Sequence, residues 1–138
     1  GVQTCALPIY RARRYCRGGR TAIAARLMSM TDALVVLTNL PDRAEALHLA
    51  QTLVERRLAA CVNVLAECTS VYRWQGAIEN ATEVPVLIKT RSALYPDVEA
   101  VIRELHPYEL PEIVAVPVSY GLSAYLDWVG AETAVAKG

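Results

Sequence analysis

The chain has 138 residues, enough for one domain with a hydrophobic core, and its 54% hydrophobic and 20% charged residues are typical of a globular protein. The net charge of zero hides a segregation: residues 1–29 hold six arginines and no acid, whereas eight basic residues face fourteen acidic ones from Met30 onward. No apolar run is long enough to span a bilayer, and the acidic main part argues against nucleic acid and anionic membranes as partners.

Residues 1–29 differ from the rest because they lack a sustained helical or strand period. A basic leader without acids could be a transit peptide. However, residues 1–9 resemble a translated adapter sequence, and Met30 looks like a natural start. We therefore expect residues 1–29 to be a disordered or artefactual extension, and residues 30–138 to form the folded domain.

The first predicted elements are a strand and a helix. The apolar run at residues 33–38 predicts a buried strand, which residues 39–42 turn. Asp42 is expected to cap the helix that follows, with Glu45 three residues later as in a capping box. The predicted apolar stripe of this helix consists of Leu47, Ala50, Val54 and Leu58.

A long hairpin is predicted next. Residues 60–73 and 77–90 read as two extended segments joined by a turn at residues 74–76, with Pro85 at an edge or a bulge. We expect Val62, Val64, Ala66 and Cys68 to share one face of the first segment. Each segment would reach roughly 45 Å, whereas a domain of this size has a radius of gyration of only about 13 Å. The hairpin should therefore overhang its own core, and an unpaired ladder favours self-association.

The remaining elements complete a split βαβ order. A second helix is expected to bury a stripe and to end at about Leu105, because Pro107 disfavours helical geometry at His106. The stripe consists of Leu94, Val98, Val101, Ile102 and Leu105. A strand over residues 112–118 and a short helix capped by Ser123 follow. The order predicts an α+β, ferredoxin-like βαββαβ sandwich with a long central hairpin and a short C-terminal helix.

Four segments make the sequence recognisable: residues 57–63, 72–76, 86–90 and, above all, 106–113, which read His-Pro-Tyr-Glu-Leu-Pro-Glu-Ile. They resemble the CutA family of divalent-cation tolerance proteins, and the likeness covers about residues 32–130. The resemblance implies a homotrimer in which long hairpins pair across subunits. It also implies a role in metal tolerance, with copper or other divalent ions bound by some members and no established catalysed reaction.

The predicted metal ligands are His106, Glu109 and Glu112, the only cluster of histidine and carboxylates in the sequence. Copper-binding relatives use a cysteine and two adjacent histidines, and the matching positions here are Thr38 and the pair Leu105–His106. The expected cofactor is therefore a weakly bound divalent cation, copper or zinc. Two alternatives stay open: His106 caps the helix, and Glu112 pairs with Lys89 or Arg91.

A second set of residues is predicted to line a cleft between subunits: Thr38, Tyr72, Trp74, Lys89 and Tyr108. The fold also resembles the PII-like regulatory trimers, so an alternative function is the sensing of a small anionic ligand, with Lys89 as the cation. The alternatives are interface packing for the aromatic residues and a solvent-directed side chain for Lys89. Cys61 and Cys68 are predicted to lie too far apart to bridge, which favours a reducing compartment.

These observations together predict a cytoplasmic, non-enzymatic homotrimer that binds a divalent metal ion. An enzyme with His106 as general base ranks last, because the spacing of the sequence supplies neither a nucleophile nor an oxyanion hole.

Overall fold

A computed structural model describes residues 31–134, and the extension predicted over residues 1–29 lies outside this range. The strands are β1 (Ala33–Leu40), β2 (Cys61–Val64), β3 (Cys68–Trp74), β4 (Ala77–Arg91) and β5 (Val114–Pro117). The helices are α2 (Arg43–Glu55), α3 (Tyr95–Leu105) and α4 (Ser123–Glu132), with a 3-10 turn, η1 (Ser92–Leu94), before α3. None of these helices has the length and apolar character needed to cross a membrane.

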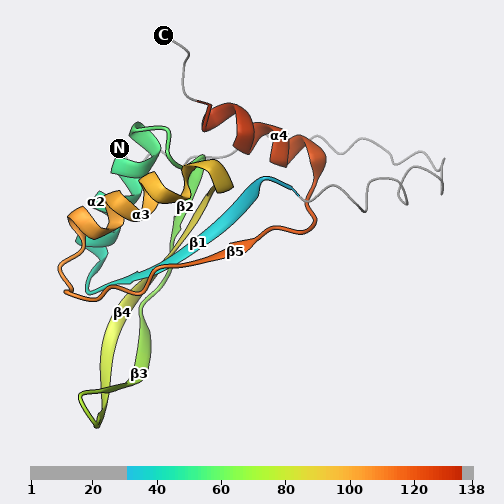
Figure 1. The fold of residues 1–138 in the computed structure, drawn as a ribbon. Coiled ribbons are helices and arrows are strands. Elements are labelled where there is room, and N and C mark those ends of the chain that lie inside the picture. The colour runs from blue at the N-terminus through green and yellow to red at the C-terminus, as the bar shows by residue number, and fades with distance from the viewer. Residues whose placement is uncertain (1–30, 135–138) are drawn as a thin grey trace.

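The sheet runs in the order β2-β4-β1-β5, and every pairing is antiparallel. Helices α2 and α3 cover one face of the sheet, and α4 lies near the end where β1 begins (Figure 1). This is the ferredoxin-like α+β arrangement, so the predicted fold class is confirmed. The predicted trimer is not shown by a single chain and stays a prediction.

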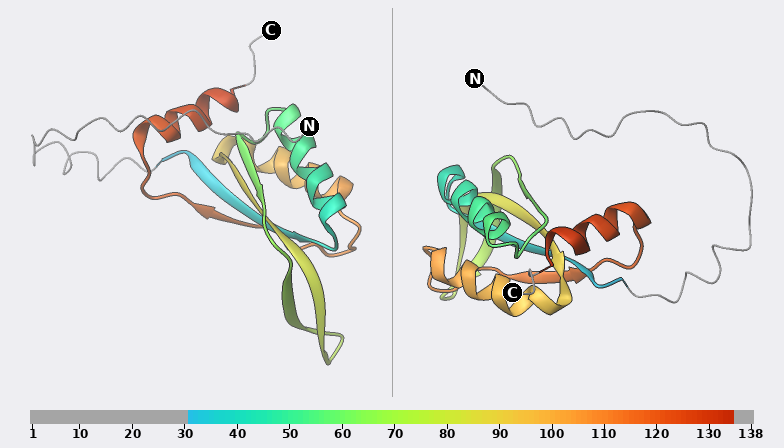
Figure 2. Two further views of the ribbon diagram at one scale, coloured as in Figure 1. Left: turned by 180° about the vertical axis from the view of Figure 1, so that it is seen from behind. Right: turned by 90° about the horizontal axis from the view of Figure 1, so that it is seen from above.

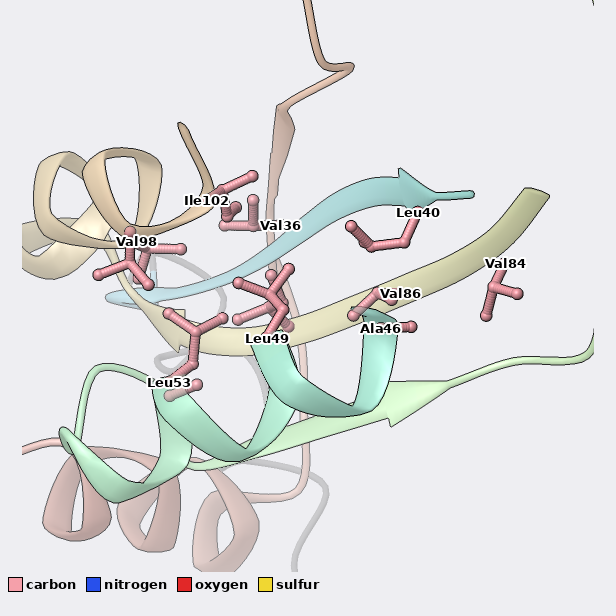
Figure 3. Close-up of a cluster of buried hydrophobic side chains, with 12 residues drawn as sticks. Val36, Leu40, Ala46, Leu49, Leu53, Val84, Val86, Val98 and Ile102 are labelled. Atoms are coloured by element: carbon pink, nitrogen blue, oxygen red, sulfur yellow. The ribbon is translucent and has the colours of Figure 1, made fainter. Parts of the chain in front are cut away.

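The core lies between the sheet and helices α2 and α3 (Figure 3). The predicted stripe of α3 is confirmed, since Val98, Val101 and Ile102 are buried. The predicted stripe of α2 is wrong: Ala46, Leu49 and Leu53 are buried, whereas Leu47 and Val54 are exposed. Both sets recur at helical spacing in this sequence, so the period alone could not choose between them.

The helix ends follow the local sequence in most cases. Asp42 caps α2 as predicted, because its Oδ1 accepts a hydrogen bond of 2.9 Å from the backbone N–H of Glu45. Helix α3 ends at Leu105, also as predicted, with His106 as its C-cap. The predicted cap at Ser123 is wrong, because Leu122 occupies the N-cap of α4 and no side chain bonds the helix end.

The first arm of the hairpin is two strands rather than one. Val64 pairs with Val86, and Cys68 pairs with Glu83, so three residues on one strand oppose two on the other. This extra residue is a β-bulge opposite Pro85, which confirms the predicted position of that proline. The bulge also reverses the faces: Val64 shares a face with Val86, whereas Cys68 shares one with Glu83. The expected common face of Val62 and Cys68 is therefore wrong.

Beyond the bulge, β3 and the first half of β4 project away from the rest of the sheet (Figure 2). Gln75 and Gly76 form the tip with positive φ angles of 46° and 84°, the geometry of a two-residue hairpin turn. Val71 and Ile78 are 70% and 71% exposed on this projecting arm. The predicted overhang is confirmed.

Thr38 lies in the core and not in a ligand cleft, which corrects the sequence-based assignment. It is fully buried on the face of β1 that carries Val36 and Leu40, and its hydroxyl has no hydrogen-bond partner within the described residues. A buried hydroxyl without a partner costs stability because it has lost its bonds to water.

We therefore expect Thr38→Val to raise the free energy of unfolding by about 1 kcal/mol, since the substitution keeps the side-chain shape and removes the unpaired hydroxyl. Urea denaturation followed by circular dichroism measures the change. Thr90→Val is the matched control: Thr90 is also fully buried, but its hydroxyl donates to the Leu58 carbonyl at 2.6 Å. That control should lower stability, and a loss in both variants would contradict the prediction.

Candidate functional site

His106 is buried and begins the segment that joins α3 to β5. Its Nε2–H donates to the Asn39 carbonyl at 2.7 Å, and its Nδ1 accepts from the backbone N–H of Tyr108 at 3.1 Å. Both ring nitrogens are therefore occupied by backbone groups, as in a neutral imidazole. This geometry corrects the predicted role of His106 from metal ligand to structural residue, because no lone pair is left for an ion.

Asn39 holds the opposite end of the same segment. Its side-chain amide donates to Oε2 of Glu112, while its backbone carbonyl accepts from His106. The end of β1 thus binds both ends of the loop at residues 106–112. The partner of Glu112 is neither Lys89 nor Arg91, the two alternatives drawn from the sequence; Arg91 instead lies 3.8 Å from Asp32.

A pocket of about 830 Å³ opens between this loop and the base of the projecting hairpin. Its lining comes from the end of β1, from β3 and β4, and from the loop after α3, which passes the hairpin in Figure 1. Tyr72 pairs with Glu79 across the hairpin, so both side chains lie on one face. The lining residues are Asn39, Ser70, Val71, Tyr72, Trp74, Glu79, Glu83, Pro107, Tyr108, Glu109, Leu110 and Glu112.

The pocket is acidic and aromatic. Four glutamates and three aromatic residues line it, and its lining contains no lysine, arginine or histidine. Glu83 is only 8% exposed, and no basic group of the described residues forms an ion pair with it. Burial raises the pKa of the Tyr108 phenol, and the charge of Glu83 and its hydrogen bond with the phenol raise that pKa further. Negative charge of this density repels anions and attracts cations.

The pocket brings together five of the eight residues predicted for the two sites: Tyr72, Trp74, Tyr108, Glu109 and Glu112. Thr38, Lys89 and His106 do not line it. Lys89 lies on β4 between Val35 and Cys61, on the far side of the bulge from the pocket. Its predicted role as the cation for an anionic ligand in a cleft between subunits stays a prediction, because a single chain does not form that cleft.

Within residues 31–134, no three His, Cys, Asp or Glu side chains come close enough together to hold a metal ion. The predicted set of His106, Glu109 and Glu112 is thus not assembled as a coordination site in one chain. Cys61 and Cys68 do not bridge each other, as predicted; both are half-buried, and neither lines the pocket. Sequence reasoning missed Asn39, Glu79 and Glu83. Of these, Asn39 gave a signal as the polar residue that ends the first apolar run.

The topology, the overhanging hairpin and the acidic pocket at its base define a ferredoxin-like α+β domain with a surface site suited to cations. Residues 34–132 match the family described as CutA1 divalent ion tolerance protein, so the chain belongs to this family.

Relatives and solved structures agree with this membership. The chain is 44% identical over 99 residues to the divalent-cation tolerance protein CutA of Thermus thermophilus. This match covers 72% of this chain and 96% of that protein. It is 46% identical over 89 residues to protein CutA of Mus musculus, where the match covers 64% of this chain and spans only half of the mouse protein. The crystal structure of CutA from Xylella fastidiosa superposes with a TM-score of 0.73 at 42% identity, covering 75% of this chain and 99% of that one.

The clamp, meaning the two hydrogen bonds by which Asn39 holds His106 and Glu112, can be tested by changing the charge at position 39. Asn39→Asp keeps the backbone carbonyl that His106 bonds but replaces the donor to Glu112 with a second carboxylate, so we expect the free energy of unfolding at neutral pH to fall by about 1 kcal/mol. Thermal or urea denaturation measures this loss. The double variant Asn39→Asp/Glu112→Gln should recover most of it, because an amide at position 112 can donate to a carboxylate at position 39. A double variant no more stable than the single one would contradict the clamp.

Proposed function

We propose that this chain acts as a non-enzymatic homotrimer that binds divalent cations weakly and takes part in the tolerance of the cell to them. The observation that carries the proposal is the pocket with four glutamates and no basic residue in its lining, in a member of the CutA1 family. Relatives of this chain are named for divalent-cation tolerance.

The trimer is supported by surfaces that one chain leaves open. In the projecting arm, β3 and the first half of β4 pair only with each other, whereas the second half of β4 pairs with both β1 and β2. The arm exposes Val71 and Ile78. Edge strand β5 exposes Val114 and Val116. Exposed apolar edge strands favour pairing with further chains, and a closed symmetric assembly limits that pairing.

The donor chemistry of the pocket supports binding through oxygen. Its carboxylates suit hard ions such as Mg²⁺ and Mn²⁺, whereas copper and zinc, the ions expected from the resemblance, prefer nitrogen or sulfur. Glu109 and Glu112 are the proposed ligands, completed by groups of a neighbouring subunit in the cleft. We also propose a cytoplasmic location, with neither nucleic acid nor membrane as partner, supported by the free cysteines Cys61 and Cys68 of the described residues and by the net negative charge from Met30 onward.

Light scattering coupled to size exclusion tests the assembly. We expect a mass three times the 15.1 kDa of the chain. Val71→Glu and Ile78→Glu place charges on the projecting arm and should shift the mass toward that of one chain, because buried unpaired charges oppose association. Glu104→Gln, an exposed change on α3, is the control that should leave the mass unchanged. A wild-type mass of 15.1 kDa would contradict the trimer.

Titration calorimetry with manganese, zinc and copper chlorides tests the cation. Glu109→Gln and Glu112→Gln should each weaken binding by about tenfold, since each removes one charged oxygen ligand. His106→Gln should bind within about threefold of the wild type if the imidazole is only structural. Copper binding that is lost with His106 alone would restore that residue as a ligand and contradict the assignment to the carboxylates.

A further inference from the structure

The pocket at the base of the hairpin combines two features that a simple metal site does not need. One is its size of about 830 Å³, which is the volume of a small-molecule pocket and far more than a single ion fills. The other is its aromatic lining, from Tyr72, Trp74 and Tyr108. We propose that this pocket binds a small organic cation, a quaternary or protonated amine, through these aromatic rings and the buried carboxylate of Glu83.

The three aromatic side chains of the pocket are partly exposed in a single chain. Tyr72, Trp74 and Tyr108 are each about two-fifths exposed. Among the described residues, neither Tyr72 nor Trp74 stacks on another aromatic ring, and the only ring that Tyr108 packs against is that of His106, at 4.9 Å between ring centroids. An ammonium group within about 6 Å of such a ring is attracted by its π electrons, most strongly in the case of tryptophan.

Glu83 supplies a charge that one chain does not neutralise. The side chain lines the pocket although it is nine-tenths buried, and no basic group of residues 31–134 pairs with it. Its neighbour is the phenol of Tyr108, which is a neutral donor. A buried carboxylate is stabilised by a cation, and an organic ammonium meets that need while it covers the apolar ring faces.

Coordination geometry separates this ligand from a metal ion. A divalent ion requires several oxygens that converge within about 2.6 Å, and no such group forms among the described residues. A quaternary ammonium spreads its charge over several carbon atoms, and it binds to rings and carboxylates that surround it without converging on one point. The inference uses the same pocket as the proposed function but does not require that a metal ion bind there.

Saturation-transfer NMR on the full chain tests the inference with tetramethylammonium chloride, at an ionic strength held constant with sodium chloride. We expect saturable binding with a dissociation constant on the order of 1 mM. tert-Butanol has a similar size and no charge, so it should show no saturable binding. Absence of saturable tetramethylammonium binding, or equal binding of tert-butanol, would overturn the proposal.

Variants assign the binding to the pocket. Trp74→Leu and Glu83→Gln should each weaken tetramethylammonium binding at least fivefold. Trp128→Phe is the matched control, because Trp128 is 38% exposed against 41% for Trp74 but lies on α4, where it contacts Tyr125. This control should bind as the wild type does. Unchanged binding in both pocket variants, or an equal loss in the control, would overturn the proposal.

A parallel titration with manganese chloride separates this proposal from the metal function. Binding of tetramethylammonium without binding of manganese supports the organic ligand and removes the assignment of a hard divalent ion to the pocket. Binding of manganese without binding of tetramethylammonium overturns the organic ligand and leaves the metal function in place.

Discussion

The two hydrogen bonds of Asn39 are the constraint on which the candidate site depends. Its carbonyl fixes His106 at the start of the loop, and its amide fixes Glu112 at the end. A loop bound at both ends to a central strand loses little further entropy when a ligand arrives, because its conformation is already set. Tyr108 and Glu109 lie inside that loop, so their placement beside the hairpin follows from a residue that belongs to neither.

The bulge opposite Pro85 is the second determinant of the site. In an uninterrupted ladder, Tyr72 and Trp74 would lie on the same face as Val62 and Val64, which is the face that α2 and α3 cover. The extra residue between Val64 and Cys68 moves both aromatic residues to the other face, where Glu79 and Glu83 lie. Because of this one-residue change in register, Tyr72 and Trp74 line the pocket; without it they would lie on the core side of the sheet.

The fold could be predicted from the sequence because its evidence is local and redundant: alternation along the strands, a stripe on α3, the N-cap of α2 at Asp42 and the end of α3 before Pro107. The site could be predicted only in part. Tyr72, Trp74 and Tyr108 were found through the resemblance and their residue type. Thr38 was misplaced, because the face of a strand that packs against the helices depends on tertiary packing and not on the residue itself. Glu83 was missed because alternation does not show which polar residue is buried.

His106 shows why residue type alone overestimates metal sites. An imidazole beside two glutamates suggests coordination, but the same ring is also a good acceptor and donor for backbone groups that strands and loops leave unpaired. The structure uses it in the second way, and the glutamates line a pocket that has neither histidine nor cysteine in its lining. The pocket therefore offers a ligand the negative charge of four glutamates, but no set of side chains from residues 31–134 that converge on one point. Such a site selects by charge and shape, so the identity of the cation depends on how well it also covers Tyr72, Trp74 and Tyr108.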